Sequence, residues 1–63
     1  MEPKIKKIID YYYKDQPADV REVKVLDESP ELGIMCLRWK TDTETVTVKV
    51  ILQQGSIIIN ELR

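Results

Sequence analysis

Residues 35–52 read MCLRWKTDTETVTVKVIL, with apolar and polar side chains alternating on both sides of a central Thr-Asp-Thr. A period of two indicates β-strands that bury one face. A two-residue turn at Asp42 and Thr43 would join these strands as an antiparallel hairpin. In that register the apolar residues face one another on one side: Trp39 opposite Val46, Leu37 opposite Val48, and Met35 opposite Val50.

The sequence after this hairpin predicts a further strand. Gln54-Gly55 is a turn sequence, and the apolar run that follows extends from Ser56 to Glu61. A two-residue turn there sets Leu52 opposite Ile57 and Val50 opposite Ile59, on the same face as the first apolar set. A slip of one residue would move every apolar set to the wrong face, so the agreement between the two hairpins supports this register.

A first strand is predicted before the hairpin, where Val23 and Val25 alternate with charged residues. We expect residues 27–30, Asp-Glu-Ser-Pro, to form the turn that follows it. The pairs that keep the apolar pattern are Val25 with Met35 and Val23 with Leu37. Short connections favour neighbouring antiparallel strands, so the four strands should form a meander in chain order.

The N-terminal segment predicts an amphipathic helix. Ile5, Ile8, Ile9 and Tyr12 fall at helical spacing and form one apolar stripe. Pro3 suits the first turn, where its missing N–H costs nothing. Pro17 disfavours helical geometry at the preceding residue, so the helix should end near residues 14–15. Helix and sheet together predict an α+β domain with the helix packed on the apolar face.

Length and composition predict one small domain, residues 1–63. A lone cysteine, Cys36, excludes an internal disulfide, and the chain contains no histidine for a zinc site. The many charged, Ile and Val residues are typical of thermophiles. The apolar runs are too short to span a membrane, and the N-terminus lacks the apolar region of a secretory signal. We therefore expect a cytoplasmic protein.

The residues that usually carry catalysis are scarce. Without histidine there is no Ser-His or Cys-His nucleophile pair, and the two glycines, Gly33 and Gly55, make no phosphate-binding loop. The acidic residues gather in the expected turns, where they favour turn formation and solubility. Cys36 is placed mid-strand beside Lys24 and Lys49, where a reactive thiol is one interpretation, although a free cysteine more often acts as a small hydrophobe. We expect no enzyme, no cofactor and no small-molecule ligand.

The same register predicts an aliphatic row on the outer face of the sheet, away from the helix. Its members come one from each strand: Leu26, Ile34, Ile51 and Ile58. Two interpretations stay open. The row could be a plain exposed surface, because β-branched residues favour strands whether or not they are buried. It could also be an interface, most simply of a two-fold dimer that packs sheet on sheet.

A second class of function would use the helix lysines to contact nucleic acid: Lys4, Lys6, Lys7 and Lys14. The balance of ten basic and eleven acidic residues argues against it, because nucleic-acid-binding domains tend to be strongly basic. The expected outer face also lacks the aromatic residues on which bases stack. The sequence therefore favours a non-catalytic module that binds a second copy or another protein.

The order of elements, one helix and then a four-stranded meander, resembles the PepSY and cystatin-like small domains. The likeness runs from Ile5 to Ile59. At the level of residues it consists of Gly-Ser-Ile-Ile-Ile at positions 55–59, a hairpin turn followed by the last strand. PepSY domains are usually exported and often inhibit or regulate a partner protein, so the resemblance implies a regulatory binding role.

Overall fold

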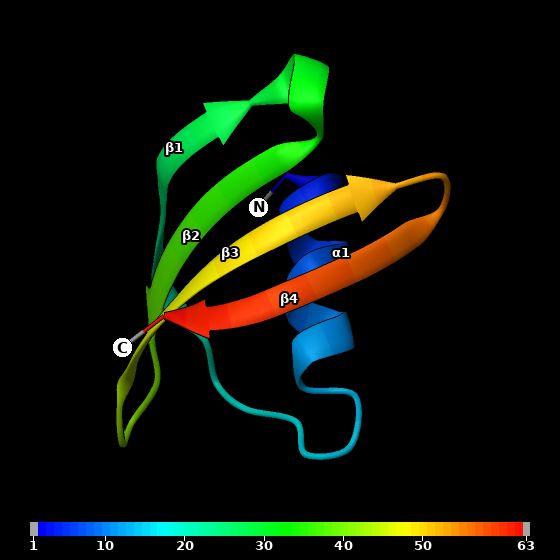
Figure 1. Ribbon diagram of the computed structural model, residues 1–63. Helices are drawn as coiled ribbons and strands as arrows, with labels where there is room; N and C mark the ends of the chain where they lie inside the picture. Colours follow the sequence, from blue (N-terminus) through cyan, green and yellow to red (C-terminus); the bar gives the residue numbers. More distant parts are fainter. Residues whose placement is uncertain (1, 63) are drawn as a thin grey trace.

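The computed structural model describes residues 2–62, and its elements follow the predicted α+β order. Helix α1 spans Pro3–Tyr12 and is followed by strand β1, Arg21–Ser29. A short 3₁₀ turn, Pro30–Leu32, leads into β2, Ile34–Lys40. Strands β3, Thr45–Gln53, and β4, Ser56–Leu62, complete a four-stranded antiparallel sheet in the order β1-β2-β3-β4. Figure 1 views this sheet from the face opposite to α1.

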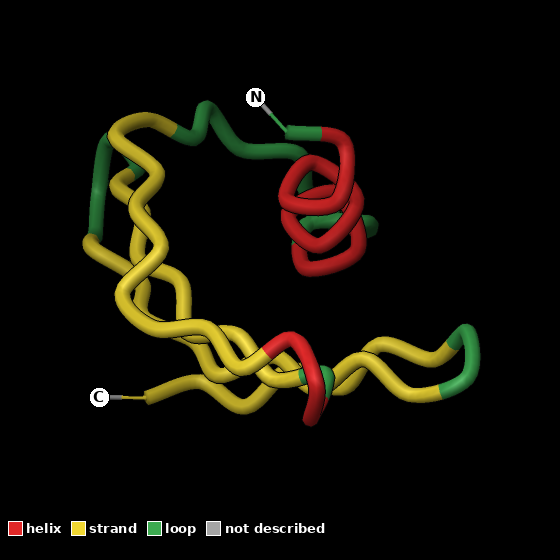
Figure 2. Tube along the Cα trace, turned by 90° about the horizontal axis from the view of Figure 1, so that it is seen from above, coloured by secondary structure: helices red, strands yellow, loops and turns green. Residues whose placement is uncertain are grey.

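The core lies between the helix and the concave side of the curved sheet, as the view from above shows (Figure 2). Leu37, Trp39 and Val48 are fully buried at its centre. The rest of the buried core comes from the helix stripe and from the inward positions of β2 and β3: Ile5, Ile8, Ile9, Met35, Val46 and Val50. Burying each aliphatic side chain contributes about 1.5–3 kcal/mol, so this layer is the main source of stability.

The two predicted hairpins after β2 are confirmed. Trp39 pairs with Val46 and Leu37 with Val48, while β4 pairs with β3 in an unbroken register from Gln53–Ser56 to Thr47–Leu62. Gln54 and Gly55 have φ of 43° and 83°, as a two-residue turn of type I′ requires.

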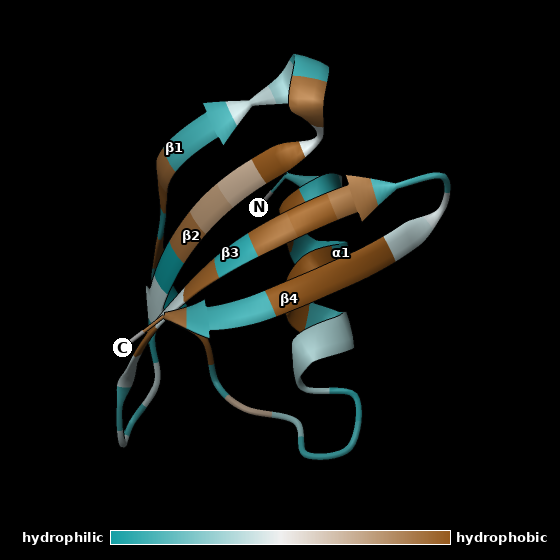
Figure 3. Ribbon diagram, in the orientation of Figure 1, coloured by the Kyte–Doolittle hydropathy of each residue, from teal (hydrophilic) through white to brown (hydrophobic). Residues whose placement is uncertain are grey.

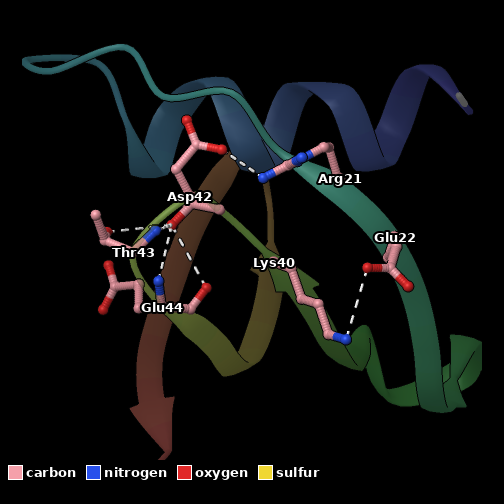
Figure 4. A network of polar contacts seen from close by, with 7 residues as sticks. Arg21, Glu22, Lys40, Asp42, Thr43 and Glu44 are labelled. Atoms are coloured by element: carbon pink, nitrogen blue, oxygen red, sulfur yellow. Dashed lines mark hydrogen bonds and ion pairs between the residues drawn. The ribbon is translucent and has the colours of Figure 1, made fainter.

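The β2–β3 turn is closed by a 2.9 Å hydrogen bond from the backbone N–H of Thr41 to the carbonyl of Glu44, and polar side chains surround it (Figure 4). The Thr41 hydroxyl accepts hydrogen bonds from the backbone N–H groups of Thr43 and Glu44, both at 3.3 Å. Arg21 forms an ion pair with Asp42 of the same turn, and Lys40 lies 3.6 Å from the carboxylate of Glu22. These exposed pairs fasten the start of β1 to the end of β2, each contributing at most about 1 kcal/mol.

The predicted register of β1 is wrong. Val25 pairs with Leu37 rather than Met35, and Met35 pairs with Glu28. The strand continues through Asp27–Ser29, residues expected to be the turn, because Pro30 starts the 3₁₀ turn only after them. Two bulges, one between Arg21 and Lys24 and one between Val25 and Asp27, absorb the extra residues.

The end of the helix also differs from the expectation. It ends at Tyr12 rather than near residues 14–15. The backbone N–H of Tyr13 still bonds to the carbonyl of Ile9 at 3.0 Å, but the Tyr13 side chain turns to accept a hydrogen bond from the indole of Trp39. This contact with the sheet draws the chain out of the helix one turn before Pro17.

Gly33 is the position where the β1–β2 connection tolerates no side chain. Its φ is 67°, and a Cβ built there would lie 2.5 Å from the carbonyl oxygen of Leu52. The close approach is held by a 2.7 Å hydrogen bond from the N–H of Leu52 to the carbonyl of Gly33.

We therefore expect Gly33→Ala to lower the free energy of unfolding more than Gly55→Ala does. Both alanines take a left-handed conformation, which costs roughly 1–2 kcal/mol, but a Cβ at Gly55 meets no atom within 4 Å. The backbone clash should add at least about 1 kcal/mol at position 33. Urea unfolding of the two variants measures the difference, and equal losses would contradict the assigned cause.

Candidate functional site on the outer face of the sheet

An aliphatic row crosses three strands on the face that α1 does not cover. Ile34 pairs with Ile51, which pairs with Ile58. Ile58 is 44% exposed, whereas Ile34 and Ile51 are half-buried by their neighbours. Figure 3 shows the hydrophobic segments of β2, β3 and β4 side by side in the half of the sheet nearest the β3–β4 turn. We call Ile34, Ile51 and Ile58 the aliphatic row.

Leu26 does not belong to this row, contrary to the expected register. It lies in the second bulge of β1, and Ser29 takes the place opposite Ile34. Leu26 is nevertheless 45% exposed, as a separate apolar side chain at the β1 edge. The expectation failed because β1 runs on through Asp27–Ser29, so the chain reverses later than expected and Leu26 is moved away from Ile34.

Polar residues flank the aliphatic row on both sides. Gln53 pairs with Ser56 beyond it. On the other side, the next paired set that faces outward is Asp27, Cys36, Lys49 and Asn60. An apolar centre with a polar rim is the usual arrangement of a protein–protein interface.

Cys36 is half-buried in this rim, and its neighbour on β1 differs from the expectation. Asp27 rather than Lys24 pairs with it, because Lys24 pairs with Arg38. Lys49 remains its neighbour on β3. The thiol thus lies between one acidic and one basic strand neighbour, not between two lysines.

The structure does not gather the helix lysines into one free basic surface. Lys4 lies 3.4 Å from the Glu28 carboxylate, and Lys6 lies 3.2 Å from Asp10 one turn along the helix. The ammonium of Lys14 stands 5.1 Å from the ring centre of Tyr11, a cation–π contact. Of the four predicted nucleic-acid contacts, Lys7 alone forms no such pair within residues 2–62, where it borders an open cleft of about 300 Å³.

An aromatic cluster at the C-terminal end of the helix was not predicted as a unit. The rings of Tyr12 and Tyr13 meet edge to face with centres 4.7 Å apart, and both pack edge-on against Trp39. The Trp39 indole donates to the Tyr13 hydroxyl at 3.0 Å, which satisfies its buried N–H. The Tyr12 hydroxyl donates to the Glu61 carboxylate at 2.8 Å. The consecutive tyrosines were a visible signal, but their partners lie 26 and 49 residues away.

This environment changes the acidity of Tyr12. Partial burial of the ring, the hydrogen bond to Glu61 and the negative charge of that carboxylate raise the pKa of Tyr12 to about 12 from 10.0. All three disfavour the phenolate.

Other kinds of site find less support in the described part of the chain. Within residues 2–62, no three His, Cys, Asp or Glu side chains lie together as metal ligands. The ten-residue α1 is too short and too polar to cross a membrane, and no other helix of residues 2–62 could do so.

Comparison with known proteins gives no relative from which a function could be inferred. No protein-family model matches the chain, and no curated protein or solved structure matches it. The resemblance to PepSY and cystatin-like domains therefore rests on the order of helix and strands and on the short sequence at positions 55–59.

We expect the phenol of Tyr12 to ionise near pH 12. Its folded pKa lies above the value of about 10 expected in the unfolded chain. The neutral phenol of Tyr12, with its hydrogen bond to Glu61, therefore stabilises the folded state. This stabilisation is complete below pH 10 and is lost as the pH rises toward 12. The absorbance of tyrosinate in wild type minus Tyr12→Phe measures the titration, with Tyr11→Phe as the matched control. A midpoint near 10 in the difference curve would contradict the assigned environment.

Proposed function

We propose that this protein is a non-catalytic interaction module that self-associates through the outer face of its sheet. The observation that carries the proposal is the aliphatic row, three isoleucines aligned across β2, β3 and β4. Apolar side chains on a sheet face gain about 25 cal/mol for each Å² of apolar surface removed from water. A second sheet packed on this face would supply that burial.

A second copy is the occupant that we favour. The row runs across the strands, so a two-fold axis parallel or perpendicular to them can set it against its own copy. The polar residues on both sides, among them Asp27, Lys49 and Gln53, would then form a hydrated rim. Small domains often rely on association for stability, and Cys36 alone cannot supply an internal disulfide.

The alternative, a nucleic-acid accessory protein that uses the helix lysines, finds less support. Three of those four lysines already contact Glu28, Asp10 or the Tyr11 ring. Electrostatic binding of the phosphate backbone needs several free basic side chains on one surface. Salt-dependent retention of a labelled oligonucleotide that is lost on replacing the four lysines by glutamine would favour this alternative instead.

The double variant Ile51→Lys/Ile58→Lys should abolish self-association, because it buries four like charges in the proposed dimer interface. Sedimentation equilibrium over a range of protein concentrations measures the change. The matched control is Val25→Lys/Leu32→Lys, which alters two aliphatic residues that are 46% and 65% exposed outside the aliphatic row. A wild type that stays monomeric at millimolar concentration, or a control that dissociates equally, would overturn the proposal.

A further inference from the structure

The two edge strands of the sheet differ in how well they are protected against pairing with another strand. Natural edge strands are usually blocked by bulges, charged residues or proline, because an open row of backbone groups templates strand addition. Strand β1 has two bulges and a positive φ of 53° at Glu22. Three charged residues of the strand form ion pairs with residues outside it: Arg21 with Asp42, Glu22 with Lys40, and Glu28 with Lys4. Pro30 directly follows the end of the strand.

Strand β4 has none of these protections along its first five residues. Ser56–Asn60 contain no proline and no charged side chain, and three consecutive isoleucines form their centre. The pairing with β3 is regular over the whole strand, without a bulge. The strand is therefore regular in its pairing, apolar at its centre and at the border of the sheet (Figure 1).

The hairpin geometry determines which backbone groups face away from β3. A two-residue turn makes Gln53 and Ser56 a hydrogen-bonded pair, and such pairs then alternate with non-bonded ones along an antiparallel ladder. Ile58 is thus bonded to Ile51, while the N–H and C=O groups of Ile57 and Ile59 point away from β3. No backbone hydrogen bond of residues 2–62 reaches these groups from another part of the chain.

We propose that β4 pairs in antiparallel fashion with β4 of a second copy, which joins two sheets into one of eight strands. The two-fold axis passes between the two Ile58 residues. The N–H of Ile57 then donates to the C=O of Ile59 in the second copy, and the C=O of Ile57 accepts from the N–H of that same residue. The symmetry of the dimer repeats this pair on the other side of the axis. Ser56 comes opposite Asn60, so within Ser56–Asn60 every facing pair joins residues of the same character.

This self-complementarity is the reason for choosing a second copy as the added strand. The ladder permits register shifts of two residues only, because the outward groups alternate. A shift one way would set the carboxylate of Glu61 against Ile57, and a shift the other way would set Ser56 against Ile58. Both registers pair a polar group with an aliphatic side chain. The register centred on Ile58 avoids this conflict.

The proposed pairing also makes the aliphatic row longer. Ile34, Ile51 and Ile58 would continue directly into Ile58, Ile51 and Ile34 of the second copy, which gives six isoleucines across one continuous face. A single copy brings three isoleucines to the face packing proposed above, and the joined sheet brings six. The edge pairing is thus distinct from the face packing proposed above, and it doubles the surface that such packing would use.

Amide hydrogen exchange tests the edge pairing residue by residue. On raising the concentration from micromolar to millimolar, exchange at Ile57 and Ile59 should slow at least about tenfold. The controls lie in the same strand, because the amides of Ile58 and Asn60 are already bonded to β3 and should keep their rates. A protein that associates while the Ile57 and Ile59 amides stay unprotected would overturn the edge pairing and leave the face packing standing.

A chemically synthesised full-length chain with N-methylated Ile59 separates the two interfaces further. The methyl group removes an outward N–H without touching the internal ladder or the side chain, so the fold should be retained and the edge pairing lost. Ile51→Lys, one strand away, should retain the slowed exchange at Ile57 and Ile59 while removing any face packing. Undiminished association of the N-methylated chain would contradict the edge pairing, and a wild type monomeric at all concentrations would contradict both interfaces.

Discussion

The buried layer between α1 and the inward side chains of β2 and β3 is the constraint on which every other feature depends. Leu37, Trp39 and Val48 are completely excluded from solvent, so neither strand can rotate or slip by one residue without exposing them. Successive residues of a strand point to opposite faces. Fixing the inward residues of β2 and β3 therefore fixes Ile34 and Ile51 outward, and β4 follows through its tight turn. The apolar character of the far side is a direct result of how the core is packed.

The parts of the fold that follow from local pattern could be predicted from the sequence. Alternation through Trp39 and Val46, together with two-residue turns, was sufficient for β2, β3 and β4 and for their mutual register. The helical stripe placed α1 on the correct face. In each case the structure follows from the spacing of apolar residues that are close together in the chain, and this spacing can be read from the sequence.

The parts that depend on distant contacts could not be predicted in this way. Residues 27–29 have the composition of a turn, yet they extend β1 because Gly33, with its positive φ, supplies the reversal four residues later. The same late reversal moves Leu26 away from Ile34. The two bulges of β1 also carry no clear sequence signature. The bonds of Tyr13 to Trp39 and of Tyr12 to Glu61 join segments that the chain separates widely. Such contacts become visible only once the elements are placed in space.

The unequal borders of the sheet determine how large an assembly built along them can become. A strand array with two receptive borders adds units without end and forms fibres. Here β1 is closed by its kinks and its charged surroundings, so the chain has one receptive border. In the proposed dimer the two β4 strands lie side by side in the middle of the joined sheet. The strand at each outer edge is then β1, which is protected against further pairing. Strand addition in the plane of the sheet therefore stops at a dimer. An exposed isoleucine-rich edge strand can thus exist without leading to fibres.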